Sequence, residues 1–335
     1  MNKKPIATNR KVVTFGEVML RLTAPDFRRF SQTNEFIATY GGSEANVAVS
    51  LANFGIPTEF VTRLPDNAMA QACIASLRAN GLGTEGIVFG GKRMGLYFLE
   101  SGASFRNSNV VYDREGSSFA TLRPGMIDWE KIFADADWFH WSGIAASLSQ
   151  EGADACLEAL QTADRMGLTI SCDLNVRKKL WNYGRSVADV MLPLVQYSDV
   201  IFAAEPEYKE VFDIAPVGFQ AVDTAYPLDL KGFETFGQKI SHIVPRCRKV
   251  FLELRNTITS NHNLLAAVLY SDQTLKYTGI YDITHEVDRV GTGDAFVGGM
   301  IYGLLTYPDN DQKALEFALA ASALKNTVYG DFNQV

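Results

Sequence analysis

Asp288-Arg-Val-Gly-Thr-Gly-Asp-Ala-Phe-Val-Gly-Gly299 is a tight glycine-rich turn that leads into a run of small and apolar residues. The composition of this run predicts a helix buried inside the protein. The first amide groups of a helix have no partner within it and carry a partial positive charge. Because glycines let a phosphate approach such amides closely, residues 291–293 predict a phosphate site at the start of the helix.

Asp294 stands in the first turn of that helix, beside any phosphate bound there. Two anions repel each other, so a site that only binds phosphate gains nothing from this carboxylate. The carboxylate is explained if Asp294 is the base that removes the proton of an attacking hydroxyl, while the amides neutralise charge on the transferring phosphoryl group. The alternative is an aspartate that stabilises a helix start behind an ordinary turn.

Composition restricts the class of protein. The chain has 335 residues, of which 47% are hydrophobic, enough for one large α/β core over residues 1–335. The net charge of −7, without a basic cluster, argues against binding to nucleic acid or anionic membranes. The N-terminus lacks the apolar core of a signal peptide, and no apolar run is as long as a membrane span. We therefore expect a cytoplasmic protein.

Cysteines and histidines indicate neither disulfides nor a metal centre. The four cysteines are far apart and show no Cys-x-x-Cys spacing, so we expect buried free thiols in a reducing compartment. The four histidines show no metal-ligand spacing, which favours structural or surface roles. These residues are Cys73, Cys156, Cys172, Cys247, His140, His242, His262 and His285.

Short apolar runs and amphipathic segments alternate along most of the chain. This alternation predicts a mostly parallel sheet covered by helices on both faces. The expected strands are residues 11–16, 58–63, 84–88, 136–143, 168–175, 199–203, 249–254 and 264–270. The expected helices, besides the one that contains Asp294, are residues 41–55, 67–80, 129–134, 149–166, 187–195, 205–212, 235–244 and 312–328.

Polar residues gather where two of these strands end. Asn175 and Arg177 lie at the end of the strand expected at 168–175, and Glu207 follows the strand expected at 199–203. Open α/β sheets bind ligands at the carboxyl ends of their strands. We therefore expect these side chains at a ligand site.

Residues 93–118 interrupt the alternation of strands and helices. Two short alternating runs, 94–100 and 109–115, predict a hairpin joined by a Gly/Ser/Asn turn. Together with an edge strand at 18–23, within the segment of about 18–40, this hairpin predicts a small β lid over the site.

Three side chains project from the expected hairpin, namely Tyr97, Tyr112 and Arg114. The planar guanidinium of Arg114 suits an anionic substrate group, because it binds a carboxylate through two hydrogen bonds. The alternative is a solvated strand arginine beside two edge aromatics.

A second glycine pair opens another helix at Gly41-Gly-Ser-Glu-Ala-Asn46. Two glycines at a helix start again favour the close approach of a ligand, and Asn46, one turn in, is placed to hydrogen-bond a ligand hydroxyl. The alternative is a plain buried helix start with Asn46 as a satisfied core residue.

The two glycine motifs, in this order and spacing, resemble the signature segments of the ribokinase-like (PfkB-type) carbohydrate kinases. The resemblance covers roughly residues 11–331 and implies an α/β three-layer sandwich with a mostly parallel central sheet and a small β lid. It also implies ATP with Mg²⁺ as phosphoryl donor and Asp294 as base. The implied anion hole consists of the N–H groups of Gly291, Thr292 and Gly293, and the implied sugar contacts are Gly42 and Asn46.

The resemblance is weaker where the nucleotide is expected. The Asn-x-x-Glu motif of the family falls on Ala204-Glu-Pro-Glu207, so only Glu207 matches, as a residue that acts on the metal through water. The family has a Lys/Gly-rich turn where this chain has Leu254-Arg-Asn-Thr-Ile-Thr-Ser-Asn-His-Asn263. By position, Arg255 and Ser260, together with Asn175, are expected to contact ATP.

Within the family, the chain most resembles the 2-keto-3-deoxygluconate kinases. The residues that carry this resemblance are Gly95-Leu-Tyr97, Tyr112-Asp-Arg114, Asp173-Leu-Asn-Val-Arg177 and Leu180-Trp181. In that subgroup two tyrosines and two arginines surround a sugar acid, and Asp331 matches a position near the substrate. The implied reaction transfers the γ-phosphoryl group of ATP to the terminal hydroxyl of 2-keto-3-deoxygluconate. Because such lids pair between subunits, we also expect a homodimer.

Two alternatives stay open. One is a kinase of the same family that acts on fructose or a related neutral sugar. The other is a catalytically silent sugar- or nucleotide-binding regulator. Ala204 and the unusual residues 255–263 keep this alternative open. A dinucleotide oxidoreductase is disfavoured, because no Gly-x-Gly-x-x-Gly follows the first strand.

Overall fold

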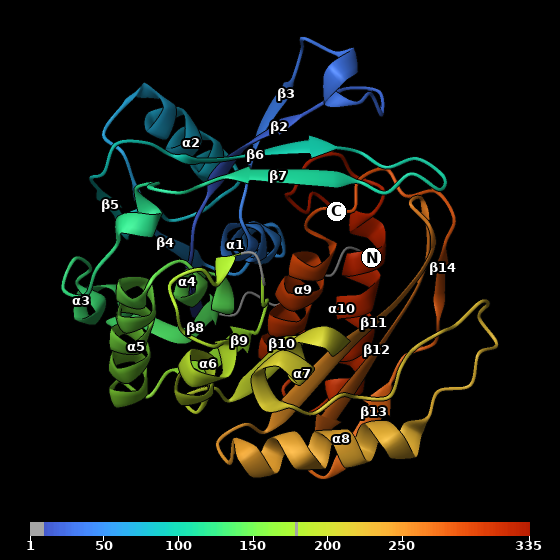
Figure 1. Ribbon diagram of the computed structural model, residues 1–335. Helices are drawn as coiled ribbons and strands as arrows, with labels where there is room; N and C mark the ends of the chain where they lie inside the picture. Colours follow the sequence, from blue (N-terminus) through green and yellow to red (C-terminus); the bar gives the residue numbers. More distant parts are fainter. Residues whose placement is uncertain (1–9, 178–179) are drawn as a thin grey trace, which may run out of the picture.

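A large twisted sheet forms the centre of the computed structural model, which describes residues 10–177 and 180–335 (Figure 1). Its ten strands run in the order β13-β12-β11-β10-β9-β8-β1-β4-β5, with β14 paired to β12. Neighbouring strands from β11 to β5 are parallel. At the other edge β12 pairs antiparallel with β11, and β13 and β14 pair antiparallel with β12. The strands are β1 Lys11–Phe15, β4 Thr58–Leu64, β5 Ile87–Phe89, β8 Ala136–Ser142, β9 Thr169–Asp173, β10 Val200–Ala203, β11 Lys249–Thr259, β12 His262–Ser271, β13 Thr274–Tyr277 and β14 Tyr281–Ile283.

Helices cover both faces of this sheet. Successive side chains of a strand point to opposite faces, so each buried strand contributes apolar side chains to both helical layers. Within β1, Val12 belongs to the core beneath α1, α9 and α10, and Val13 to the core beneath α3 to α8. A third cluster packs α2 against α1 and β4. The helices are α1 Ser43–Asn53, α2 Ala68–Ala79, α3 Trp129–Phe133, α4 Gly143–Ser147, α5 Gln150–Arg165, α6 Val187–Val195, α7 Glu205–Phe212, α8 Leu230–Ile243, α9 Thr292–Thr306 and α10 Asp311–Lys325. The predicted three layers are therefore present.

A second sheet of four strands, in the order β3-β2-β6-β7, crosses the top of the molecule in Figure 1, with β6 and β7 above α1. Its strands are β2 Met19–Thr23, β3 Ile37–Gly41, β6 Gly95–Glu100 and β7 Asn109–Asp113. Alternate residues of β6 are buried, so one face of this sheet covers the main body. The predicted hairpin is present, since β6 and β7 pair antiparallel.

Two strand predictions were wrong in an informative way. The run at 18–23 is not an edge strand, because β2 pairs with β3 on one side and with β6 on the other. The strand expected to end at Leu254 continues to Thr259 and pairs with β12 along its whole length. Residues 254–263 are therefore part of a long hairpin. Polar side chains interrupt the apolar run there, but backbone pairing with β12 continues.

Smaller differences concern element ends and short elements. The helix expected from 235 begins at Leu230, where Asp229 caps it by accepting from Gly232 N. The strand expected at 84–88 is β5, which begins at Ile87 and ends at Phe89. Four elements of the described residues were not predicted, β3, α4, β13 and β14. Short 3₁₀ turns also occur at Phe30–Gln32 and Phe119–Thr121.

The four cysteines are buried and unpaired, as predicted. Among the described helices, none combines the length and the apolar character that crossing a membrane requires.

Candidate active site

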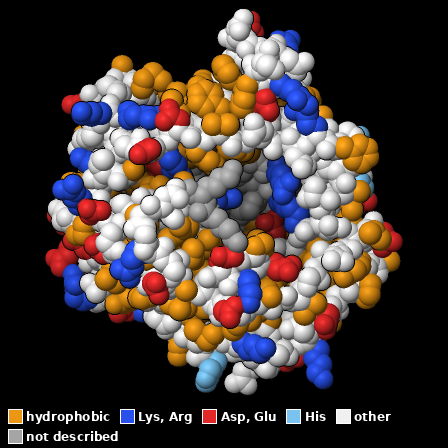
Figure 2. Space-filling model, viewed as in Figure 1, with side chains coloured by type: hydrophobic (Ala, Val, Ile, Leu, Met, Phe, Trp, Pro, Cys, Tyr) orange, Lys and Arg blue, Asp and Glu red, His pale blue; other side chains and the backbone are white. Residues whose placement is uncertain are grey.

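A cleft of about 650 Å³ lies at the carboxyl ends of the central strands, under the small sheet. Figure 2 shows it as a hollow near the middle of this face. The structure brings every residue predicted for the site to the wall of this one cleft, although the roles of these residues remain predictions. They are Gly42, Asn46, Tyr97, Tyr112, Arg114, Asn175, Arg177, Glu207, Arg255, Ser260, Gly291, Thr292, Gly293, Asp294 and Asp331.

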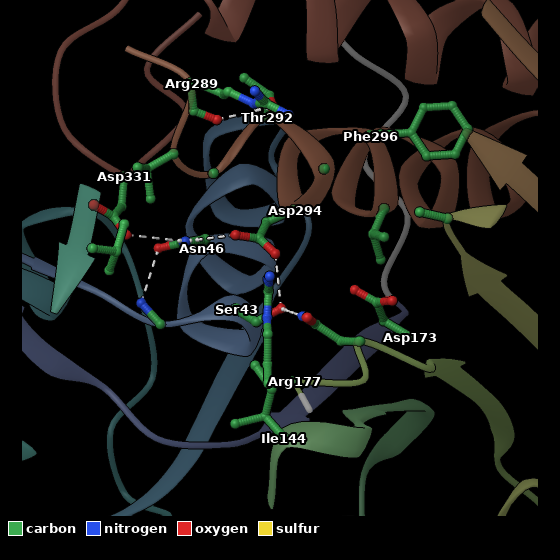
Figure 3. A pocket seen from close by; sticks show the side chains of 18 of the residues that line it. Ser43, Asn46, Ile144, Asp173, Arg177, Arg289, Thr292, Asp294, Phe296 and Asp331 are labelled. Carbon is green, nitrogen blue, oxygen red and sulfur yellow. Dashed lines mark hydrogen bonds between the residues drawn. The ribbon is translucent and has the colours of Figure 1, made fainter. Parts of the chain in front are cut away.

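Asp294 is held at the meeting point of two helix N-termini. Gly291 is the N-cap of α9 with φ of 84°, so Asp294 falls in the first turn of that helix. From the first turn of α1, the Ser43 hydroxyl donates to Asp294 Oδ1 at 2.7 Å and the Asn46 amide donates to Oδ2 at 2.6 Å (Figure 3). Both oxygens of the carboxylate are therefore oriented before any ligand binds.

The environment makes Asp294 a stronger base than an ordinary aspartate. Burial raises the pKa of its carboxyl group, and the negative charge of Asp331 raises it further. The hydrogen bonds from Asn46 and Ser43 and the charge of Arg177 act in the opposite direction, but the net shift is upward.

Ser43 connects Asp294 to the end of β9. Its hydroxyl accepts a hydrogen bond at 3.0 Å from the side-chain amide of Asn175. Asn175 adopts a left-handed backbone with φ of 35°, and its buried Oδ1 has no hydrogen-bond partner among the described residues. A buried acceptor without a partner is costly, so Asn175 Oδ1 is available to a donor on a bound ligand.

The glycine pair before α1 serves the protein's own packing. A Cβ on Gly41 would lie 2.0 Å from the Asp331 carboxylate, and one on Gly42 would lie 2.0 Å from the Glu17 carbonyl oxygen. Close approach of a ligand, the reason expected from the sequence, is thus not what requires these two glycines.

The lid residues are engaged with the protein as well as facing the cleft. The Tyr97 hydroxyl donates to the Asp331 carboxylate at 2.6 Å, and its ring centroid lies 5.9 Å from that of Tyr112. Arg114 is buried and forms an ion pair with Glu17, with Nη2 at 2.5 Å from Oε2. It is therefore not the solvated strand arginine of the alternative interpretation, and since it lines the cleft its predicted role toward an anionic substrate stays a prediction. Its charge is balanced before a substrate enters.

Arg177 approaches the cleft from the opposite side. It extends from the segment after β9 toward Asp294 (Figure 3) and lowers the pKa of that carboxyl group. Among the described residues it forms no ion pair, in contrast to Arg114. Arg177 is therefore the cation on this wall whose charge a ligand can use.

Two further arginines stand near the start of α9. Arg255 of β11 donates to the Thr292 hydroxyl at 2.8 Å, and its buried Nη1 has no hydrogen-bond partner among the described residues. Arg289 of the same wall has a lowered pKa because of burial and the nearby charge of Arg255. Two neighbouring cations at a helix N-terminus favour an anion between them. Ser260, in contrast, donates to the Arg106 carbonyl at 2.7 Å and supports the tip of the lid.

Two acids, Asp173 and Glu207, line the same cleft. Burial and the charge of Glu207 raise the pKa of Asp173 well above its ordinary value, and burial raises that of Glu207. One Glu207 oxygen accepts from Ala204 N at 2.7 Å and so caps its own helix, α7. Within the described ranges, no group of three or more potential protein ligands for a metal exists. Two carboxylates with raised pKa values nevertheless suit a cation that takes its other ligands from phosphate and water.

Sequence reasoning missed several residues that shape the site. Ser43 follows the glycine pair directly and Arg289 lies within the quoted turn, so both were visible but given no role. Arg21 was also visible as a lone charge on an alternating apolar strand, Met19-Leu-Arg-Leu-Thr23. Glu17 left no signal, because only the fold places it beside Arg114.

Glu44 leads to a prediction about stability. It lies buried in the first turn of α1, accepts a hydrogen bond from Ser142, and has its pKa raised to about 7 by burial. The folded state therefore binds more protons than the unfolded state between pH 4.5 and 7, and stability falls as the pH rises through this window. Relative to Glu44→Gln, the wild type should lose up to about 3 kcal/mol of unfolding free energy across it.

Urea denaturation of both proteins at several pH values measures this difference. Glu151→Gln, at an exposed acid in the first turn of α5, is the control and should run parallel to the wild type. A constant difference between wild type and Glu44→Gln would show that Glu44 has an ordinary pKa.

Comparisons with known proteins match most of this chain to carbohydrate kinases. The model of the family described as "pfkB family carbohydrate kinase" matches residues 9–225 and 263–334 of this chain. The 2-dehydro-3-deoxygalactonokinase of Haloferax volcanii is 31% identical over 96% of this chain and 92% of its own length. Fructokinase-1 of Oryza sativa is 27% identical over 95% and 92%. The crystal structure of 2-dehydro-3-deoxygluconokinase from Thermotoga maritima has a TM-score of 0.89 and 40% identity over 97% of this chain and 96% of its own.

Proposed function

Since this chain belongs to the pfkB family of carbohydrate kinases and has the predicted ribokinase-like fold, we propose that it phosphorylates a 2-keto-3-deoxy sugar acid. The first candidate is 2-keto-3-deoxygluconate, also called 2-dehydro-3-deoxygluconate, with ATP as donor and the terminal hydroxyl as acceptor. Two similar proteins, the kinases of Haloferax volcanii and Thermotoga maritima, are named for such acids.

The observation that carries the proposal is the placement of Asp294. Its carboxylate is oriented by Ser43 and Asn46, has a raised pKa, and lies in the first turn of α9 behind the amides of residues 291–293. The sugar hydroxyl oxygen bonds to the γ-phosphorus while Asp294 takes its proton. The bond from the γ-phosphorus to the β–γ bridging oxygen breaks, ADP leaves with that electron pair, and the amides neutralise the charge that builds up.

We assign the donor to the wall that carries Arg255 and Arg289. The free Nη1 of Arg255 and the start of α9 suit phosphate oxygens. Mg²⁺ would neutralise phosphate charge when bound, and Glu207, acting through water, and Asp173 are the residues placed to hold it. Arg255 lies between the two ranges matched by the family, at the point where the sequence departs from its usual turn.

We assign the sugar acid to the wall under the lid. Tyr97, Tyr112 and Asn46 offer hydroxyl and amide groups to a sugar. Arg177 is the cation for its carboxylate, because Glu17 already balances Arg114. Arg114 is left as a charge-paired support of that wall, which changes the role first expected for it.

A neutral sugar is the second candidate, and the pairing of Arg114 with Glu17 favours it. Fructokinase-1 of Oryza sativa, 27% identical to this chain, is named for such a substrate. On this alternative the fold and the role of Asp294 stay the same, and Arg177 serves phosphate alone.

ADP release from ATP–Mg²⁺ separates these candidates in a panel of 2-keto-3-deoxygluconate, 2-keto-3-deoxygalactonate, fructose, ribose and adenosine. We expect turnover confined to the two keto-deoxy acids, and their ratio identifies the preferred configuration at C4. Turnover with fructose alone would replace the sugar-acid proposal. No turnover with any member would favour a silent binding protein.

Arg177→Met should separate carboxylate from phosphate recognition. Loss of a hydrogen-bonded ion pair costs about 1.5–3 kcal/mol, so KM for the sugar acid should rise roughly 10- to 150-fold with KM for ATP little changed. Arg165→Met, which removes an exposed ion pair with Glu130, is the control. A rise in KM for ATP instead would assign Arg177 to the phosphates.

We also propose that the chain forms a homodimer through the small sheet. Apolar side chains on this sheet and its connections are exposed, including Phe36, Ile37 and Val111. Light scattering after gel filtration should give twice the mass of one chain, and Ile37→Lys should reduce it to that of a monomer.

A further inference from the structure

We propose that Arg21, a residue of the lid strand β2, is a positioning residue for phosphoryl transfer. It does not line the cleft, and it acts through two aspartates that hold the anion-hole turn and the sugar wall. The kinetic part of this inference rests on the proposed function, and the structural part stands without it.

Every nitrogen of the Arg21 guanidinium is used inside the protein. Nη2 donates to Asp288 Oδ2 at 2.5 Å, Nη1 to Asp331 Oδ1 at 2.7 Å, and Nε to the Thr23 hydroxyl at 2.7 Å. The residue is 2% exposed. One side chain of the small sheet thus bridges two segments that come from the last fifty residues of the chain.

Asp288 shapes the turn that precedes α9. Its Oδ1 accepts from Val290 N at 3.1 Å, immediately before Gly291, and its Oδ2 accepts from Gly330 N at 3.0 Å. A shift of this carboxylate therefore shifts the backbone whose amides form the predicted anion hole.

Asp331 couples the same guanidinium to the sugar wall. Its carboxylate accepts from the Tyr97 hydroxyl at 2.6 Å, and its carbonyl oxygen would lie 2.1 Å from a Cβ on Gly291. The segment around Asp331 is therefore packed directly against the anion-hole turn. Arg21 holds both sides of that contact at once.

A second buried cation, Lys325, lies beside the same aspartates. Lys325 is fully buried, and its ammonium group donates to the carbonyl oxygens of Asp288 at 3.4 Å and Val328 at 3.2 Å. Two cations, Arg21 and Lys325, thus face two anions, Asp288 and Asp331. Removing Arg21 leaves an unbalanced negative charge close to the place where phosphoryl charge builds up, and burial makes such a charge costly.

The same imbalance changes the titration of Asp294. The negative charge of Asp331 raises the pKa of Asp294, so removing the cation that offsets Asp331 should raise it further. The acid limb of the kcat profile should then move to higher pH. The other charged groups that interact with Asp294 stay in place, namely Glu44, Asp173, Arg177 and Lys325.

The test compares Arg21→Met and Arg21→Lys with the wild type. A turn displaced by about 1 Å costs about 100-fold in rate, so kcat of Arg21→Met should fall by about that factor. Arg21→Lys keeps the charge but cannot bridge two carboxylates as a fork, so its kcat should be intermediate. Only Arg21→Met should shift the acid limb of the kcat profile to higher pH, because Arg21→Lys keeps the positive charge. Arg93→Met, which removes a partly exposed ion pair of the lid region with Asp113, is the control and should change neither kcat nor the acid limb.

Amide hydrogen exchange tests the structural part without any turnover. Both Arg21 variants, but not Arg93→Met, should exchange faster at residues 288–293 and 328–332. Unchanged exchange there, or faster exchange with a normal kcat, would overturn the proposal. If Arg21→Met does not fold, Arg21→Lys decides both measurements. A wild type without turnover would overturn the proposed function, and exchange alone would then decide whether Arg21 holds the turn.

Discussion

Asp294→Asn should lower kcat by about 100- to 10,000-fold, the range that general-base catalysis contributes. Asparagine keeps the size of the side chain and can still contact Ser43 and Asn46, but it cannot take the proton of the sugar hydroxyl. The amides at the start of α9 are unchanged, so the affinity for ATP should stay close to that of the wild type.

Steady-state kinetics and ATP titration of the variant measure the two quantities separately. Asp189→Asn, at an exposed aspartate in the first turn of α6, is the matched control for the loss of a helix-terminal charge and should be near normal. A near-normal kcat for Asp294→Asn would remove the base from the mechanism.

The pH profile gives an independent check on the same residue. Asp294 must be deprotonated to act, so activity is lost as the pH falls through its pKa. Burial raises that pKa above the ordinary value of 3.8, and the acid limb of kcat should therefore lie above pH 3.8. The residual activity of Asp294→Asn should lack this limb.

Gly291→Ala should abolish most activity and also destabilise the fold. Gly291 has φ of 84°, a conformation that costs an L-residue about 1–3 kcal/mol. In addition, the new Cβ would lie 2.1 Å from the Asp331 carbonyl oxygen, so the backbone of one segment must move. Because Gly291 is the N-cap of α9, that movement displaces the amides proposed as the anion hole. Displacements near 1 Å cost about 100-fold in rate.

Gly330→Ala separates backbone strain from the clash. Gly330 has the same φ of 84°, lies near the same turn, and has no atom within 4 Å of its Cβ position. We expect this variant to lose some stability but to keep most of its kcat. Equal losses of kcat in both variants would mean that strain alone, rather than contact between Gly291 and Asp331, explains the effect.

Local patterns were sufficient for the main features of fold and site. Apolar runs predicted most of the central strands, and the helix expected at 149–166 is α5, which Ser149 caps by accepting from Gly152 N. The run from Gly291 to Gly299 predicted a buried helix whose first turn carries Asp294, as α9 does. These signals depend on neighbours in the chain, because caps, turns and periodicity are set within a few residues.

Pairings between distant segments could not be derived in this way. The sequence shows an arginine at position 114 but not that Glu17 pairs with it, and this pairing is the reason for the different role that we propose for Arg114. The extension of β11 to Thr259 was missed for a similar reason, since backbone bonds to β12 hold it despite its polar side chains.

The sequence by itself determined that this chain has an α/β core and a buried helix whose first turn carries Asp294, the residue proposed as base. The tertiary structure decided which charges are free to act on a ligand. Arg21 and Asp331, 310 positions apart, meet in the interior, whereas Arg177 remains without an ion pair among the described residues. The physical reason is that a charge acts through space and through its burial. Its partner and its pKa therefore depend on packing between segments, which no local pattern contains.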